Sequence, residues 1–192
     1  MPLRVKHDSS IPLDDWLPGL KASDASAYEA IFERMHGPLY RYVARIVRDE
    51  ALAYDVLQDV FLKLWSNRAT LRIEVSLSAF LYTMARNRAL NALRRRKREV
   101  VSDEPNLFAL HKAEGSVEAS FEAEELAAHL ASWMQELPPK RGEVFALSRL
   151  HGLSNLEISQ IMGLSKRTVD THIVHALRQL RTRYHALHTK RS

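Results

Sequence analysis

Apolar side chains recur at spacings of three and four residues along most of this 192-residue sequence. That spacing places them on one face of an α-helix, whereas a half-buried strand needs an apolar residue at every second position. The chain holds only six glycines, and no Asn-Gly or Asp-Gly pair separates two alternating runs, so nothing signals a β-hairpin. The sequence therefore predicts an all-α protein.

The first half of the chain predicts four helices. Asp24 is a suitable cap for the first, which is expected to stop at Gly37-Pro38 because proline lacks the N–H that an inner helical turn needs. The second helix is expected to run from there to about Asp49, and the third to occupy residues 49–67.

The fourth predicted helix begins after Ser76 and changes character along its length. Its apolar stripe comprises Leu77, Phe80, Leu81, Met84 and Ala85. The same face continues with Arg88, Asn91 and Arg95, so the last turns are predicted to leave the core. Taken alone, the five basic residues at 94–98 are either a charge run that meets only solvent or part of a surface that binds nucleic acid.

The second half of the chain carries a helix-turn-helix pattern. Ser154 and Glu157 have the spacing of a capping box, Gly163 can end the short helix in a left-handed conformation, and Ser165 can cap the longer one. Apolar residues line one side of the longer helix and leave a polar, partly basic side that suits a DNA major groove. The alternative is an amphipathic helical hairpin whose polar face meets only solvent.

Charge divides the chain into parts. Seven basic residues and no acid lie at 86–98, seven acids and one base at 102–125, and seven Lys or Arg with one acid at 163–192. We therefore predict two small helical domains joined by a flexible acidic linker. The predicted parts are an N-terminal extension at 1–22, a first domain at 23–99, a linker at 100–121, a second domain at 122–187 and a tail at 188–192.

Several classes of function are disfavoured. The chain has no cysteine, which excludes disulfides and thiolate chemistry, and it has no phosphate-binding glycine loop or nucleophile with a base, so we expect neither an enzyme nor a cofactor. The histidine pairs 172/175 and 185/188 lack a third ligand, so no metal site is expected. Without a signal peptide or a long apolar run, a cytoplasmic protein that does not insert in membranes is expected.

Three segments are the most informative, and they read LYRYVARIVRDEALAYDVLQDVFLKLW, AFLYTMARNRALNALRRRKRE and ELPPKRGEVFALSRLHGLSNLEISQIMGLSKRTVDTHIVHALRQLR. They resemble the extracytoplasmic-function (ECF) group of bacterial RNA polymerase sigma factors. The resemblance covers about three quarters of the chain in the same order. It implies a protein that binds core RNA polymerase and directs promoter-specific transcription initiation.

The resemblance implies that the third predicted helix docks on the clamp helices of the largest polymerase subunit. The contacts expected there are Asp55, Gln58, Asp59 and Lys63. Phe61 and Trp65, on the apolar side of the same helix, are expected in the core.

The fourth helix would then open and capture the minus-ten element of the promoter. Amides at Asn87 and Asn91 suit base edges, basic side chains suit phosphates, and Tyr82 is a candidate for base stacking. Many relatives carry an acid where Asn91 stands, so a structural role is open there as well. The expected minus-ten residues are Arg86, Asn87, Arg88, Asn91, Arg94, Arg95, Arg96, Lys97 and Arg98.

The second domain would read the minus-thirty-five element while it rests on the flap of the second large polymerase subunit. The expected DNA contacts are Ser165, Lys166, Arg167, Thr168, Asp170, Thr171, His172, His175 and Arg178. Asp170 stands where many relatives are basic, and it either accepts from a cytosine amino group or pairs with Arg167 or another neighbour. The run TVDTHIVHAL resembles the iron-uptake type, whose members are controlled with a transmembrane anti-sigma protein, so an anti-sigma partner is expected.

An alternative interpretation is a helix-turn-helix protein that acts without RNA polymerase. Residues 1–100 would then be an effector or dimerisation domain of a stand-alone transcriptional regulator. Such a regulator should bind a specific duplex tightly by itself, whereas a sigma factor should need core polymerase.

Overall fold

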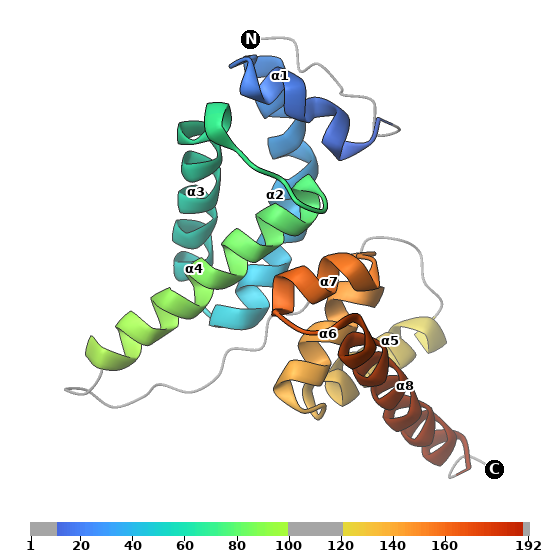
Figure 1. Cartoon of the computed structure of the whole chain (residues 1–192). Helices are drawn as coiled ribbons and strands as arrows, with labels where there is room; N and C mark the ends of the chain where they lie inside the picture. The colour runs from blue at the N-terminus through green and yellow to red at the C-terminus, as the bar shows by residue number, and fades with distance from the viewer. Residues whose placement is uncertain (1–10, 100–120, 190–192) are drawn as a thin grey trace. The chain divides into compact units, whose positions relative to one another are not determined.

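The computed structural model describes residues 11–99 and 121–189 of the chain. The chain divides into two compact units, residues 1–110 and 111–192, and every regular element that the structure describes is a helix (Figure 1). The prediction of an all-α protein with two helical domains is confirmed. The predicted acidic linker lies almost wholly outside the described residues.

Unit 1 is built on three long helices that pack pairwise against one another. Its elements are η1 (Leu13–Trp16), α1 (Leu17–Lys21), α2 (Ala25–Val47), α3 (Glu50–Ser66), η2 (Arg68–Thr70) and α4 (Leu77–Glu99). The side chains buried most completely at their meeting point include Ile31, Leu39, Tyr42, Leu57, Leu64, Leu77 and Leu81.

The predicted break at Gly37-Pro38 is wrong, because α2 runs through both residues as one helix. An inner proline removes one backbone hydrogen bond and costs roughly 3 kcal/mol in an isolated helix. Met35 and Leu39 on either side of the break are nevertheless buried in the same core, so packing holds the two halves in line. The helix ends instead at Arg48, which has a left-handed conformation with φ 55°.

The described part of the predicted N-terminal extension folds onto unit 1. Leu20 is fully buried, and α1 packs against α2. The Asp14 carboxylate accepts a hydrogen bond from the Leu77 backbone N–H at 2.5 Å, which satisfies a free donor at the start of α4. This segment therefore helps to set where α4 begins.

The apolar stripe of α4 does not turn polar where the sequence pattern predicts. Ala85, Ala89 and Ala92 remain buried, so small side chains carry the contact with α2 and α3 onward along the helix. Asn91 and Arg95 are exposed beside that stripe rather than on its continuation. Small residues allow close approach of the helices, and the polar residues are displaced to the outer side.

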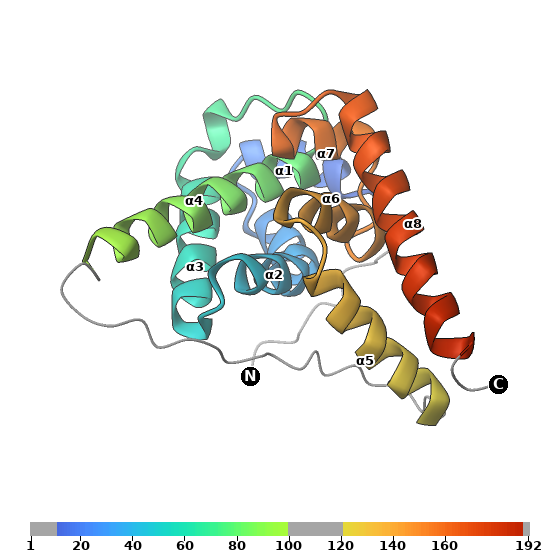
Figure 2. The same cartoon turned by 90° about the horizontal axis from the view of Figure 1, so that it is seen from below.

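Unit 2 consists of α5 (Phe121–Gln135), α6 (Pro139–Arg149), α7 (Asn155–Met162) and α8 (Lys166–Thr189). The long helix α8 packs against each of the other three (Figure 2). The capping box of Ser154 and Glu157 is present, and Gly163 has the left-handed conformation with φ 63°. The predicted helix-turn-helix is therefore confirmed in its local structure.

Two leucines near the end of α6 give a matched test of the unit 2 core. Leu147 is 0% exposed and Leu150 is 59% exposed. We expect Leu147→Ala to lower the free energy of unfolding by about 2–5 kcal/mol, because it removes buried methyl groups and leaves a cavity. Leu150→Ala should change it by less than about 0.5 kcal/mol. Urea unfolding followed by circular dichroism measures both, and equal losses would contradict this core.

Candidate nucleic-acid and polymerase interfaces

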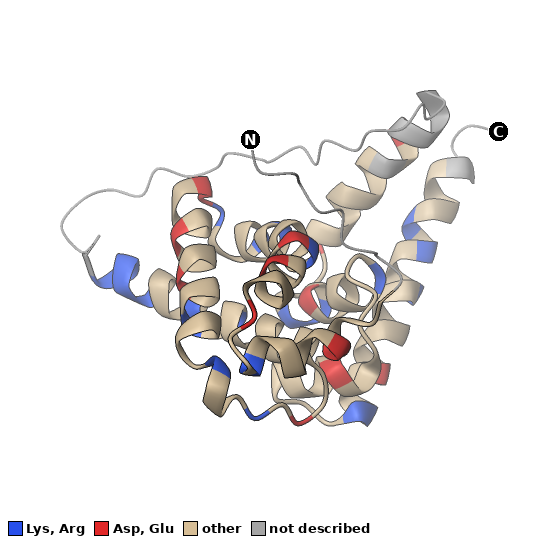
Figure 3. Cartoon of the chain, turned by 90° about the horizontal axis from the view of Figure 1, so that it is seen from above, with Lys and Arg blue, Asp and Glu red and all other residues tan. Residues whose placement is uncertain are grey.

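The C-terminal part of α4 is a basic surface. Arg94, Arg95, Lys97 and Arg98 are all exposed, and Figure 3 shows the gathering of basic residues at this end of the helix. The segment therefore offers several cations to a polyanion at once, which is the arrangement that phosphate binding requires.

Arg96 is held by an ion pair with the neighbouring helix. Its guanidinium lies 2.7 Å from the Asp49 carboxylate, which also accepts from the Leu52 backbone N–H and so caps α3. The pKa of Asp49 is lowered, first by the Leu52 hydrogen bond and then by Arg96. Of the five basic residues at 94–98, Arg96 is thus partly committed to positioning α4 on α3.

Asn87 and Asn91 are exposed one turn apart on the outer side of α4. The Asn91 side-chain oxygen accepts a hydrogen bond from Arg94 at 3.3 Å, and its amide nitrogen is left to donate elsewhere. The structure therefore places both amides beside the basic surface, where a nucleic acid could reach them. Arg86 is only half-buried and lies on the same helix.

The prediction that Tyr82 could stack on a base is wrong. Its side chain is 2% exposed and packs edge-on against Tyr42, with ring centroids 5.2 Å apart. Burial also raises the pKa of Tyr82. A base could reach this ring only if the core of unit 1 opened.

The outer side of α3 presents the predicted polymerase contacts together. Asp55, Gln58, Asp59 and Lys63 are all exposed, as the sequence pattern predicts. Phe61 is buried in the core, whereas Trp65 is half-buried and stacks with Arg68, whose guanidinium carbon lies 4.1 Å from the ring centroid.

Two apolar residues of α3 were missed by the sequence interpretation. Leu62 is 63% exposed and lies one helical turn from both Gln58 and Asp59, so it falls within the polar row formed by Asp55, Gln58, Asp59 and Lys63. Tyr54 is also exposed. A central apolar patch with a polar rim is typical of protein interfaces. The signal was present in the sequence, because both residues fall outside the stripe formed by Leu52, Val56 and Val60.

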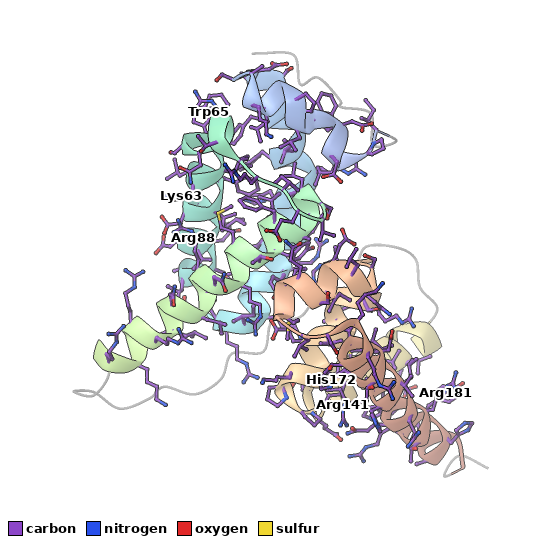
Figure 4. The ribbon with its side chains drawn as sticks, viewed as in Figure 1. Lys63, Trp65, Arg88, Arg141, His172 and Arg181 are labelled. Atoms are coloured by element: carbon purple, nitrogen blue, oxygen red, sulfur yellow. The ribbon has the colours of Figure 1, made fainter. Side chains whose placement is uncertain are left out.

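One ion pair joins the two predicted surfaces of unit 1. The Arg88 guanidinium, expected at DNA, lies 2.7 Å from the carboxylate of Asp59, expected at the polymerase. Figure 4 shows Arg88 beside α3 rather than at the basic end of α4. In this structure Arg88 therefore neutralises the charge of Asp59 in the polar row on α3.

Some of the predicted DNA contacts on α8 form hydrogen bonds within the helix, and others are exposed cations. The Ser165 hydroxyl accepts from the Thr168 backbone N–H and so caps the helix, and the Thr171 hydroxyl donates to the Arg167 carbonyl. Lys166, Arg167 and Arg178 are exposed cations on the same helix. The Ser165 cap thus stabilises the helix start, while the charged side chains of the helix reach outward.

A shallow hollow of about 280 Å³ lies on the exposed side of α8. Its lining consists of Arg167, Asp170, Thr171, Val174 and His175. Val174 was missed by the sequence interpretation, which treats the polar side of the helix alone. It is 54% exposed, and an apolar side chain there could contact a thymine methyl group in the major groove.

His172 is less accessible than its place on the helix suggests. It is half-buried, and burial lowers its pKa, with Arg141, His175 and Lys140 lowering it further. Figure 4 shows His172 and Arg141 near each other. The neutral form is favoured in the folded protein, so His172 adds hydrogen-bonding capacity rather than a firm positive charge.

The residues that the structure describes contain no group of three His, Asp or Glu side chains placed to bind a metal ion. None of the helices in that part of the chain is both long and apolar enough to cross a membrane.

Comparison with known proteins agrees with both units. Residues 31–99 match the family described as Sigma-70 region 2, and residues 130–180 match Sigma-70, region 4. The RNA polymerase sigma factor CarQ of Myxococcus xanthus is 31% identical over 72% of this chain and 78% of its own. The ECF RNA polymerase sigma factor SigM of Bacillus subtilis is 26% identical over 81% of this chain and 94% of its own.

A solved structure shows the same fold. It is the sigma factor RpoE in complex with the anti-sigma factor NepR from Bartonella quintana, with a TM-score of 0.61 at 21% sequence identity. The match covers 81% of this chain and 94% of that one.

These matches define the class of RNA polymerase sigma factors, which bind the core enzyme and direct it to promoters. The two regions and the relatives show that this chain belongs to the ECF group of sigma factors.

The lowered pKa of His172 predicts that the stability of unit 2 depends on pH. A histidine that protonates less readily when folded stabilises the fold above its ordinary pKa of 6.5, and that stability is lost as the pH falls below this value. Hydrogen exchange of α8 peptides should therefore accelerate between pH 7.5 and 5.5, after correction for the intrinsic rate. His172→Gln should weaken this acceleration, and His185→Gln, at an exposed site on the same helix, should not. Identical profiles for the three proteins would contradict this role.

Proposed function

We propose that the two units divide the work of promoter recognition, with unit 1 at the core polymerase and the minus-ten element and unit 2 at the minus-thirty-five element. The observation that carries this proposal is the exposed basic end of α4, which lies in one compact unit with the exposed polar row of α3. A single small unit can therefore hold DNA beside the polymerase.

The row on α3 is proposed to contact the clamp helices of the largest polymerase subunit. Asp55, Gln58 and Lys63 supply charge and hydrogen bonds, and the exposed Leu62 supplies apolar area at the same contact. Charged groups at the rim mainly steer association and orientation, whereas buried apolar groups at the centre carry more of the affinity. Leu62 is thus proposed as a principal contact beside the charged residues.

The outer side of α4 is proposed to divide its roles between bases and backbone. Asn87 and Asn91 present amides that suit base edges, and Arg94, Arg95, Lys97 and Arg98 present cations that suit phosphates. Arg88 and Arg96 are proposed to act in part by fixing α4 on α3, since each is ion-paired in the structure.

Unit 2 is proposed to insert the first turns of α8 into the major groove of the minus-thirty-five element while it rests on the flap of the second large subunit. Lys166, Arg167 and Arg178 suit phosphates or guanine edges. Thr171 and His175 line the hollow on the exposed side of this helix and face the same way as Arg167.

We further propose that the protein acts in the cytoplasm, without catalysis of its own, and is restrained by an anti-sigma protein. The complex of RpoE with NepR supports such a partner by likeness of fold. The exposed apolar residues Leu62 and Leu156 offer surface that a partner could cover. Assignment to the iron-uptake type stays a prediction from the run TVDTHIVHAL.

Transcription with purified core polymerase tests this function. A library of templates randomised upstream of a fixed reporter is transcribed with and without the protein, and the transcribed templates are sequenced. We expect two enriched elements at fixed spacing that depend on the protein. Tight, specific duplex binding by the protein alone, without polymerase-dependent transcription, would favour the stand-alone regulator instead.

Variants of α4 test which of its side chains contact DNA bases and which contact the DNA backbone. Arg95→Gln should weaken binding of the holoenzyme to a recovered promoter evenly across sequences and reduce the salt slope of log K by about 1. Asn87→Ala should leave that slope unchanged and relax the preferred bases of the minus-ten element. Arg72→Gln, at an exposed arginine outside α4, is the matched control and should behave as wild type. A change in base preference caused by Arg95→Gln, with none caused by Asn87→Ala, would contradict this assignment.

A further inference from the structure

Helix α8, which is proposed to read the minus-thirty-five element, carries one negative charge at its exposed start. Asp170 is the only acid in α8, and Lys166 and Arg167 precede it within one turn. A carboxylate at a DNA surface is repelled by the phosphates and weakens non-specific binding. Its presence there is favourable only where a DNA group that donates hydrogen bonds meets it.

The Asp170 carboxylate is held in place by another helix. The side-chain nitrogen of Asn155, the first residue of α7, donates to Asp170 Oδ1. Within the part of the chain that the structure describes, no Lys or Arg lies in ion-pair distance of this carboxylate, although Arg167 lines the same hollow. The amide thus fixes the orientation of the carboxylate without cancelling its charge.

The contact with Asn155 is a pairing with a neighbour, which is one of the two roles that the sequence leaves open for Asp170, and it is compatible with the other role. Pairing with Arg167 would remove the carboxylate from DNA recognition, whereas the contact with Asn155 occupies one oxygen and leaves the second available. A carboxylate carries about four lone-pair sites, so one amide donor does not saturate it. Asp170 is exposed and lines the hollow on the outer side of α8, so the free oxygen is accessible.

We propose that Asp170 accepts a hydrogen bond from the amino group of a cytosine in the minus-thirty-five element, with Asn155 as the residue that positions its carboxylate. The proposal rests on the proposed function of α8 as the helix that reads this element. It assigns the base preference at one position to an acidic side chain.

The edges of the bases favour cytosine over the alternatives. In the major groove cytosine offers an amino donor, guanine offers two acceptors, and thymine offers an acceptor and a methyl group. Adenine also has an amino donor, but its N7 acceptor lies beside that group and repels a carboxylate. An acceptor-only side chain therefore selects cytosine.

Val174 supports this arrangement from the same side of the helix. It lies four residues after Asp170, lines the same hollow and is exposed. An apolar side chain one turn further on cannot donate to a base, so it does not compete with Asp170 for the same edge. Asp170 and Val174 can therefore contact adjacent base pairs.

The experiment is the template selection described above, run with core polymerase and four full-length proteins. Wild type should enrich cytosine at one upstream position by about tenfold over the other bases, as a single base contact allows. Asp170→Asn should shift that position toward adenine, because an amide can both donate to N7 and accept from the amino group. Asn155→Ala should reduce the cytosine preference at the same position, and Arg178→Gln should lower yield without changing it.

The outcomes separate the proposal from the function on which it rests. If wild type enriches no upstream element, the proposed function of α8 fails. If wild type enriches an element but Asp170→Asn and wild type return the same bases, the reading role of Asp170 is overturned. If Asn155→Ala lowers thermal stability while the base preference is unchanged, Asn155 only braces the two helices and its positioning role is overturned.

Discussion

The close packing of α4 on α2 and α3 is the constraint on which unit 1 depends. Ala85, Ala89 and Ala92 keep the contact buried along α4, and side chains of this size let the backbones approach closely. Because the helix is held along this line, its exposed amides and cations are presented in one orientation. A loosely attached helix would offer the same charges without a defined register.

The ion pairs between α3 and α4 add little stability, and they mainly determine which charged side chains remain available to a partner. The pairs of Arg88 with Asp59 and of Arg96 with Asp49 are partly exposed to solvent, and exposed pairs contribute about 0–1 kcal/mol. Their effect lies in which charges remain available. Arg88 pairs with Asp59 of the polar row on α3, and Arg96 of the basic end of α4 pairs with Asp49, the N-cap of α3. A partner that engages Asp59 therefore also changes the surroundings of Arg88.

In unit 2, local caps define the helix-turn-helix. The capping box at the start of α7 and the Ser165 cap of α8 satisfy backbone groups within a few residues. The turn between them is therefore well defined, and the first turns of α8 are exposed in a fixed geometry. The link from Asn155 to Asp170 adds a contact across that turn, and it holds a side chain rather than the backbone.

The sequence by itself determined the helical class, the helix-turn-helix with its caps, and the exposed polar rows on α3 and α8, because periodicity and capping depend on residues a few positions apart. Tertiary structure decided that α2 continues through Pro38, that Tyr82 is buried, and that Arg88 lies against Asp59. These features depend on burial and on charges that meet from distant parts of the chain. A local pattern shows which side chains are polar, and only packing shows which of them are free.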